Sequence, residues 1–237
     1  MAPLTTHLLN LHPNPLTLAT THPFLTAAGR GALPPSTLAA WLVQDEHYIH
    51  AYIPFIGHLL TKLTLPTSIP LGRKNASLHH RILDCLVGAL SNVRREEAFF
   101  AETIRGYGIE ARSEGPTEGT RKYLELFGEV GREGTLVEGM VVLWATELCY
   151  LRAWQFAGSE TSEAQGGDGD VVRREFIPNW TSREFEQFVE ELGGLVDECA
   201  EEVGQGGLKS CEAVWERVLE VEKGFWPEVK EGKEEEG

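Results

Sequence analysis

Apolar residues recur along most of this chain at the three- and four-residue spacing of helices that bury one face. The pattern is clearest between residues 36 and 63, where the apolar positions at helical spacing are Leu38, Trp41, Leu42, Ile49, Ile53, Ile56 and Leu60. No stretch shows the two-residue alternation of a half-buried strand, and no segment repeats. The pattern therefore predicts an all-α protein.

Glycine, proline and capping residues set the boundaries of the other predicted helices. These are expected over residues 15–29, 75–107, 117–130, 135–157, 184–203 and 208–226. The spacing Thr135…Glu138, and again Thr181…Glu184, fits a capping box, in which the two residues bond each other through side chain and backbone. About seven helices with short connections are best accommodated in a single bundle.

The ends of the chain and one internal stretch lack this organisation. Residues 158–170, GSETSEAQGGDGD, combine Gly, Ser and acidic residues without a period, which predicts a disordered surface insertion. Residues 1–14 are interpreted as an N-terminal extension, and residues 228–237 as a solvated acidic tail. Residues 15–227 are expected to form one domain, because the connections are too short to hold a second core.

The charge balance narrows the classes of function. The 237 residues carry 21 Lys and Arg against 36 Asp and Glu, a formal net charge of −15, which argues against a nucleic-acid partner. A hydrophobic content of 42% can support a buried core. No apolar run approaches the roughly 20 residues of a membrane span, and no signal peptide opens the chain. Four scattered cysteines indicate reduced thiols, so we expect a cytoplasmic protein.

Two predicted helices carry an acid on or beside an apolar face. Asp45, Tyr48 and Tyr52 lie at i, i+3 and i+7 and so share one face of the helix over residues 36–63. This triplet is either the wall of a pocket, with one acid and two phenols, or a flank on which Asp45 meets solvent. A carboxylate that points inward has to be paired or solvated.

The helix over residues 135–157 repeats the arrangement with Glu147, Tyr150 and Trp154. Glu147 has the least polar neighbours of any acid in the chain, so it is as well explained by burial toward a site as by exposure. The last helix offers several glutamates, including Glu222, and composition alone does not select one of them.

Metal and nucleophile motifs are missing from the sequence. Eight histidines are present, but neither an HExxH motif nor a Glu-x-x-His pair occurs, so no metal site is expected. Cys149 adjoins an acid rather than a base, which is typical of an unreactive thiol. There is no phosphate-binding loop and no GxGxxG motif.

Several motifs in order resemble the TenA family, which comprises thiaminase II and its relatives. They are His-Pro-Phe at 22–24, Gly-Ala-Leu-Pro at 31–34, Gln-Asp-Glu-His-Tyr at 44–48, REEAFF at 95–100, a helix that bears Tyr123, LWATELCYLRAW at 143–154, FIPNWTSREFEQFV at 176–189 and EKGFW at 222–226. The resemblance covers roughly residues 15–227 apart from the insertion.

This resemblance implies a haem-oxygenase-like all-α fold without a cofactor, a closed pocket for aminopyrimidine fragments of thiamin, and a homo-oligomer, either dimer or tetramer. Bacterial thiaminase II enzymes carry a nucleophilic Cys in a Pro-Cys segment, where this chain reads Trp-Ala-Thr-Glu at 144–147. The chain is similar instead to a subgroup with Glu at this region, which is associated with hydrolysis of aminomethyl pyrimidine, and in some cases of the formylamino form, to hydroxymethyl pyrimidine.

Carried over residue by residue, the resemblance assigns catalytic roles to three acids. Asp45 would bind the pyrimidine ring nitrogen and amino group, Glu147 would orient or activate water, and Glu222 would protonate the leaving group. General acid–base catalysis can divide these roles between carboxylates in different environments. The pocket would be lined by tyrosines and a tryptophan, namely Tyr48, Tyr52, Tyr123, Tyr150 and Trp180.

Two other hypotheses stay open on this scaffold. One is a non-catalytic binding or regulatory protein, since fold does not fix function. The other is a metal-dependent oxidase, against which the missing Glu-x-x-His pair counts. Three inward acids favour the hydrolase.

Overall fold

The computed structural model describes residues 2–66, 77–160, 170–201 and 203–229, and over these ranges the chain is helical without strands. This confirms the predicted all-α class. The helices are α1 (Leu4–Leu11), α2 (Pro13–Thr20), α3 (Pro23–Gly29), α4 (Pro35–Thr61), α5 (Leu78–Tyr107), α6 (Glu118–Glu133), α7 (Leu136–Ser159), a π-helical turn (Val172–Phe176), α8 (Ile177–Trp180), α9 (Arg183–Ala200) and α10 (Gln205–Lys223). Most of the predicted insertion and tail lies outside the described residues.

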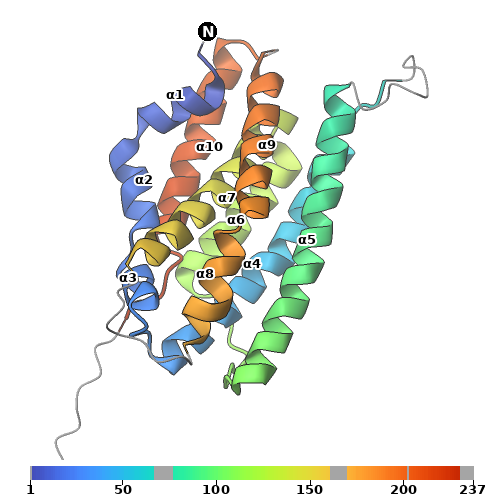
Figure 1. Cartoon of the computed structure of the whole chain (residues 1–237). Helices are drawn as coiled ribbons and strands as arrows, with labels where there is room; N and C mark the ends of the chain where they lie inside the picture. The colour runs from blue at the N-terminus through green and yellow to red at the C-terminus, as the bar shows by residue number, and fades with distance from the viewer. Residues whose placement is uncertain (1, 67–76, 161–169, 202, 230–237) are drawn as a thin grey trace, which may run out of the picture.

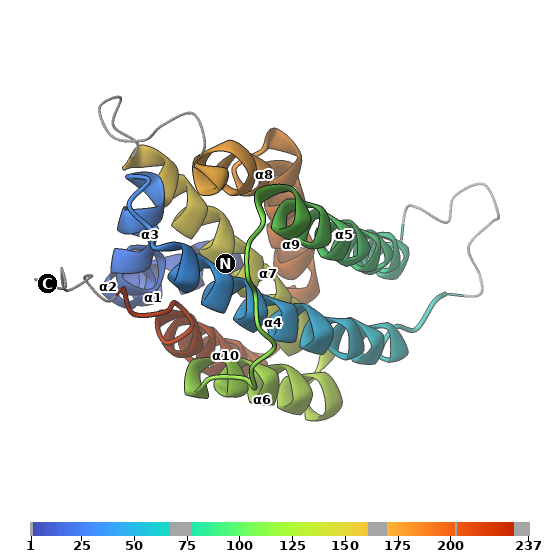
Figure 2. The ribbon, with the colours of Figure 1, turned by 90° about the horizontal axis from the view of Figure 1, so that it is seen from below.

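Helix α7 is the centre of the bundle, which explains why it is apolar almost all round. It contacts α2, α3, α4, α6, α8, α9 and α10 (Figure 1). Helix α4 packs between α5 and α6, while α6 lies against α10 (Figure 2). None of the described helices is long and apolar enough to cross a membrane.

The predicted N-terminal extension contains helix α1, which is docked on the bundle. Leu4 and Leu8 are buried, and α1 packs against α9. The backbone amide and hydroxyl of Thr5 donate hydrogen bonds to the two carboxylate oxygens of Asp197 at 2.8 and 2.9 Å. Most of residues 1–14 is therefore part of the helical bundle and does not project from it as an extension.

Several predicted helix boundaries are wrong. The last helix, expected over residues 208–226, spans Gln205–Lys223 and so includes Gly206 and Gly207, and the helix expected over residues 117–130 continues to Glu133. The single helix expected over residues 15–29 is two helices, because Pro23 disfavours helical geometry in the preceding residue and starts α3 with His22 as its cap. Helix α9 begins from Ser182, whose hydroxyl accepts a hydrogen bond from the Phe185 amide, so the capping box expected at Thr181 does not form. The box at Thr135 and Glu138 is confirmed.

Two helix pairs approach so closely that only glycine fits between them. A Cβ on Gly29 in α3 would lie 2.0 Å from the Ala157 carbonyl oxygen of α7. A Cβ on Gly119 in α6 would lie 1.9 Å from the Gly224 carbonyl oxygen at the end of α10. The second contact brings the start of α6 against the end of α10, and thereby sets Tyr123 beside Glu222.

Candidate active site

A small cavity lies inside the bundle where α4, α5, α7 and α9 meet. Helix α4 supplies the Asp45, Tyr48 and Tyr52 face, and α7 supplies Glu147 and Tyr150 from the opposite side. The lining is completed by Ile49, Ala89, Asn92, Val93, Glu96 and Phe188. The helical spacing on α4 and α7 thus places two acids and three phenols around one space.

Asp45 is the most enclosed acid of this cavity, with only 4% of its surface exposed. Its Oδ2 accepts a long hydrogen bond of 3.4 Å from the Tyr150 hydroxyl, and its Oδ1 has no hydrogen-bond partner within the described part of the chain. Burial, and then the charge of Glu96, raise the pKa of Asp45 well above its usual value, which the bond from Tyr150 opposes. The carboxyl therefore favours its neutral form and leaves one oxygen for a ligand.

Glu147 faces the same cavity from α7 and is half-buried. The Tyr52 hydroxyl donates a hydrogen bond of 2.7 Å to its Oε1. Burial, with the charge of Glu96 as the next cause, raises the pKa of Glu147 to about 8. A carboxyl with such a pKa can gain or lose a proton near neutral pH, as general acid–base catalysis requires.

Glu222, on α10, is buried next to the cavity but does not line it. Its Oε2 accepts a hydrogen bond of 2.5 Å from Tyr123, and burial raises its pKa to about 8 against the effect of that bond. Its Oε1 has no partner among the described side chains and backbone. The Tyr123 ring meets the Tyr48 ring edge-on at 5.1 Å, so Glu222 and Tyr123 lie one ring behind the cavity wall.

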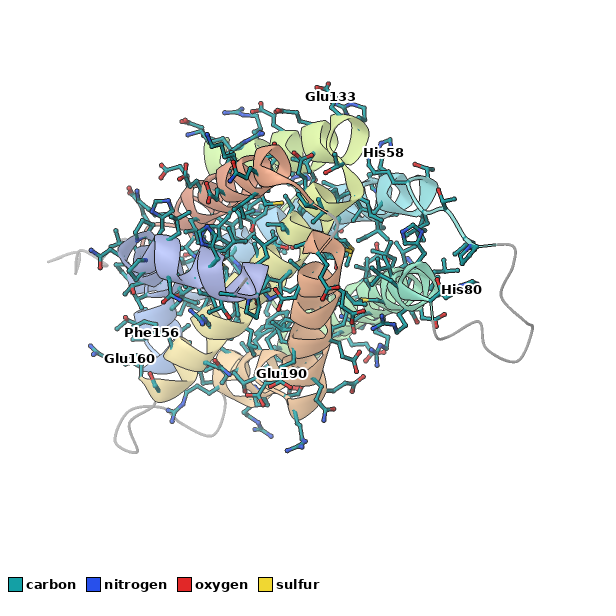
Figure 3. All side chains as sticks on the ribbon, turned by 90° about the horizontal axis from the view of Figure 1, so that it is seen from above. His58, His80, Glu133, Phe156, Glu160 and Glu190 are labelled. Atoms are coloured by element: carbon teal, nitrogen blue, oxygen red, sulfur yellow. The ribbon has the colours of Figure 1, made fainter. Side chains whose placement is uncertain are left out.

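Trp180, expected in the pocket, lies in a groove next to the cavity. Its ring meets Tyr150 edge-on at 5.2 Å, and its indole N–H donates a hydrogen bond of 3.0 Å to Glu96. Glu96 lines both spaces. The buried acids contrast with surface acids such as Glu133, which projects from the rim of the bundle (Figure 3).

Six residues that line the cavity were not among the predicted site residues, and Glu96 is the most important of them. The charged run RREE at 94–97 indicates a solvated helix face, but the structure turns Glu96 inward. A signal was available, since Glu96 follows Ala89 and Val93 at the spacing of the buried stripe of α5. Asn92 and Phe188 gave no comparable signal.

Neither a cysteine nor a group of metal ligands stands in this cavity. Cys149 is fully buried, and burial raises its pKa well above the usual value, which keeps the thiol protonated. Within the described ranges, no group of three or more His, Cys, Asp and Glu side chains is placed to hold a metal ion.

Comparisons with known proteins point to one family. A sequence model of the TENA/THI-4/PQQC family matches residues 14–231. A Fusarium pseudograminearum protein described as a probable transcription factor is 30% identical, over 95% of this chain and 51% of that protein. The chain therefore spans about half the length of this relative. A Glycine max protein described as a probable bifunctional TENA-E protein is 20% identical, over 88% of this chain and 85% of that protein.

Solved structures show the same fold. A TenA homologue from Pyrococcus furiosus superposes with a TM-score of 0.77 and 20% identity, over 94% of this chain and 98% of that chain. A TenA homologue from P. horikoshii superposes with a TM-score of 0.74 and 15% identity, over 95% and 97% of the two chains. These likenesses confirm the predicted haem-oxygenase-like helical fold.

Proposed function

This chain belongs to the TENA/THI-4/PQQC family, and from that premise we propose that it is an aminopyrimidine hydrolase of thiamin salvage. The reaction replaces the amino group of aminomethyl pyrimidine by a hydroxyl from water, and the formylaminomethyl compound is a second candidate substrate. The observation that carries this proposal is the pairing of Asp45 and Glu147 across a cavity walled by three tyrosines.

Asp45 is suited to hold the pyrimidine. Its pKa is raised well above the usual value, so its carboxyl offers one donor and one acceptor side by side. A ring nitrogen next to an amino group presents the complementary acceptor and donor. The phenol rings of Tyr48, Tyr52 and Tyr150 offer flat apolar walls for the aromatic ring, with ring centroids of Tyr48 and Tyr52 6.0 Å apart.

Glu147 is suited to activate water. In its deprotonated form it accepts the proton of a water molecule whose oxygen bonds to the methylene carbon, while the carbon–nitrogen bond breaks. Tyr52 donates to Oε1 at 2.7 Å and leaves Oε2 for the water. The leaving nitrogen takes a proton and departs as ammonia.

We assign that proton to Glu222. With a pKa of about 8 it is mostly protonated at neutral pH and can act as a general acid. Since the Tyr48 and Tyr123 rings separate it from the cavity, this assignment includes a shift of Tyr48 when the ligand binds. The homo-oligomer expected from the sequence resemblance is part of the same proposal.

The experiment that tests the proposal is a substrate screen. The purified chain is incubated with aminomethyl pyrimidine, formylaminomethyl pyrimidine and thiamin, with and without EDTA, and hydroxymethyl pyrimidine is measured by mass spectrometry. We expect product from the aminomethyl compound in both conditions, and product formation slower by ~10²–10⁴-fold in a Glu147→Gln variant. If EDTA abolishes the activity and a specific divalent ion restores it, the proposed mechanism is wrong and the reaction depends on a metal ion.

A regulatory protein is the second candidate, because the Fusarium relative is described as a probable transcription factor. A pyrimidine-binding regulator would bind the aminopyrimidines in the same screen and form no product. The net charge of −15 argues against direct contact with DNA by this chain.

A further inference from the structure

The enclosed cavity meets a larger groove on one side of the bundle. The groove has a volume of about 340 Å³ and is lined by residues of α5, α8 and α9, which are neighbours in Figure 2. The two spaces share three lining residues, Asn92, Glu96 and Phe188. The shared residues form a neck between the groove and the cavity.

Glu96 is the acid best placed to carry a negative charge at this neck. Burial raises its pKa, but the hydrogen bond from the Trp180 indole at 3.0 Å and the charge of Arg95 both oppose that effect. Glu147 and Glu222, with pKa values of about 8, are mostly protonated at pH 7, and Asp45 is held in its neutral form. The charge of Glu96 raises the pKa of both Asp45 and Glu147, so Glu96 is the acid to whose negative charge the other two respond.

The surroundings of the neck offer this carboxylate no buried cation. None of the residues that line the cavity is Lys, Arg or His. Arg95, in the groove, is exposed and lies 3.4 Å from Glu184, so its charge is shared with another acid. The unpartnered and buried Oδ1 of Asp45 marks the cavity beyond the neck as the place where a ligand is bound.

We propose that the groove between α5 and α9 is the entrance to the cavity, and that Glu96 at its neck is a specificity-determining residue for aminopyrimidines that carry a positively charged ammonium group. The inference rests on the proposed function. The ammonium group of an entering substrate forms an ion pair with the Glu96 carboxylate at the neck, whereas a neutral hydroxymethyl pyrimidine forms none there. Glu96 acts on entry and binding. Inside the cavity the ammonium group releases one proton to solvent, so the neutral amine is the form that Glu222 protonates when Glu147 activates water and the carbon–nitrogen bond breaks.

The test compares Glu96→Gln with Glu97→Gln. Gln keeps the acceptor for Trp180 and removes only the charge, while Glu97 is the next residue of α5, pairs with Arg94, and lies outside both the cavity and the groove. Binding of aminomethyl pyrimidine and of hydroxymethyl pyrimidine is measured by titration calorimetry at pH 7, and kcat and KM are measured for the aminomethyl compound.

We expect Glu96→Gln to weaken binding of the aminomethyl compound and raise its KM by about tenfold, the size of one lost charge-assisted contact. Its affinity for the hydroxymethyl compound should stay within about twofold of the Glu97→Gln control. The acidic limb of its kcat–pH profile should move to lower pH, because the charge of Glu96 raises the pKa of Glu147. Equal effects on both ligands, or no effect on either, would overturn the role of Glu96 and leave the proposed function standing. A wild-type chain that binds neither ligand would overturn the proposed function itself.

A second variant tests the entrance. Phe188→Trp enlarges a side chain that lines both spaces, while Phe185→Trp enlarges one that lines only the groove. If ligands enter through the neck, Phe188→Trp should slow their association in stopped-flow fluorescence several-fold more than Phe185→Trp. Equal association rates in the two folded variants would contradict this route.

Discussion

Glu147→Gln is the substitution for which the structure makes the most detailed prediction. The change keeps the shape of the side chain and its bond from Tyr52, but removes the ability to accept a proton. It should therefore affect catalysis and stability in opposite directions. General acid–base catalysis typically contributes ~10²–10⁴-fold, and we expect turnover to fall by that range.

The effect on stability follows from the pKa of Glu147. At 1.36 kcal/mol per pH unit, a rise from 4.5 to about 8 corresponds to roughly 5 kcal/mol against the charged form. Since Glu147 is half-buried and keeps some contact with solvent, we expect the Gln variant to gain on the order of 1–3 kcal/mol in free energy of unfolding at a pH where Glu147 is charged.

The sign of the pH dependence is fixed by linkage. The folded protein holds this proton more tightly than the unfolded chain, so the contribution of Glu147 to stability is greatest below about pH 4.5, falls as the pH rises, and levels off above about pH 8. Gln stays neutral throughout and escapes this loss. The variant should match the wild type near pH 4.5 and be more stable at pH 9.

The assay is urea unfolding at pH 4.5 and pH 9, combined with turnover by mass spectrometry. Glu133→Gln, which replaces an exposed acid at the end of α6, is the control and should change neither property. If Glu147→Gln gives the same stability difference at both pH values, Glu147 is not desolvated in the folded protein. If its turnover equals that of the wild type, another group activates the water.

Three further predictions test the surroundings of the site. Tyr52→Phe removes the hydrogen-bond donor to Glu147, the proposed base, and should move the acidic limb of the pH–rate profile to higher pH. Tyr123→Phe removes the donor to Glu222, the proposed acid, and should move the alkaline limb to higher pH. A limb that does not move would refute the corresponding pairing. Gly119→Ala should lower the free energy of unfolding in urea by roughly 1–3 kcal/mol, because the added methyl group would meet the backbone at the end of α10. Gly194→Ala, whose methyl group would meet open space on α9, should raise it by ~0.5–1 kcal/mol. Cys149→Ala should leave kcat within about twofold, and loss of turnover in a folded variant would mean that the thiol takes part.

Local chemistry was enough to predict most of the fold. Apolar stripes at helical spacing identified α4 and α5, and a long apolar run that begins at the Thr135 box identified α7. The break at residues 21–22 was missed because the apolar spacing continues across it, although the chain cannot remain helical before Pro23. The start of α9 was misplaced by one residue because Thr181 and Ser182 are both good caps.

The site was harder to predict because it depends on which helices meet. Asp45 and Glu147 stood out because each lies among apolar neighbours on its own helix. Glu96 lies in a charged run, and only the packing of α5 against α4 and α9 turns it inward. Glu222 could be selected only through the family resemblance, since the last helix holds several equivalent glutamates. Its separation from the cavity by Tyr48 depends on how distant helices pack, which no local sequence pattern predicts.

The most direct test of the central claim is hydrolysis of aminomethyl pyrimidine in water enriched in oxygen-18. The proposed mechanism predicts hydroxymethyl pyrimidine with one labelled oxygen and an equal amount of ammonia, both lost in Glu147→Gln and both kept in Glu133→Gln. Tight binding of the substrate without labelled product would contradict the hydrolase and favour the regulatory protein.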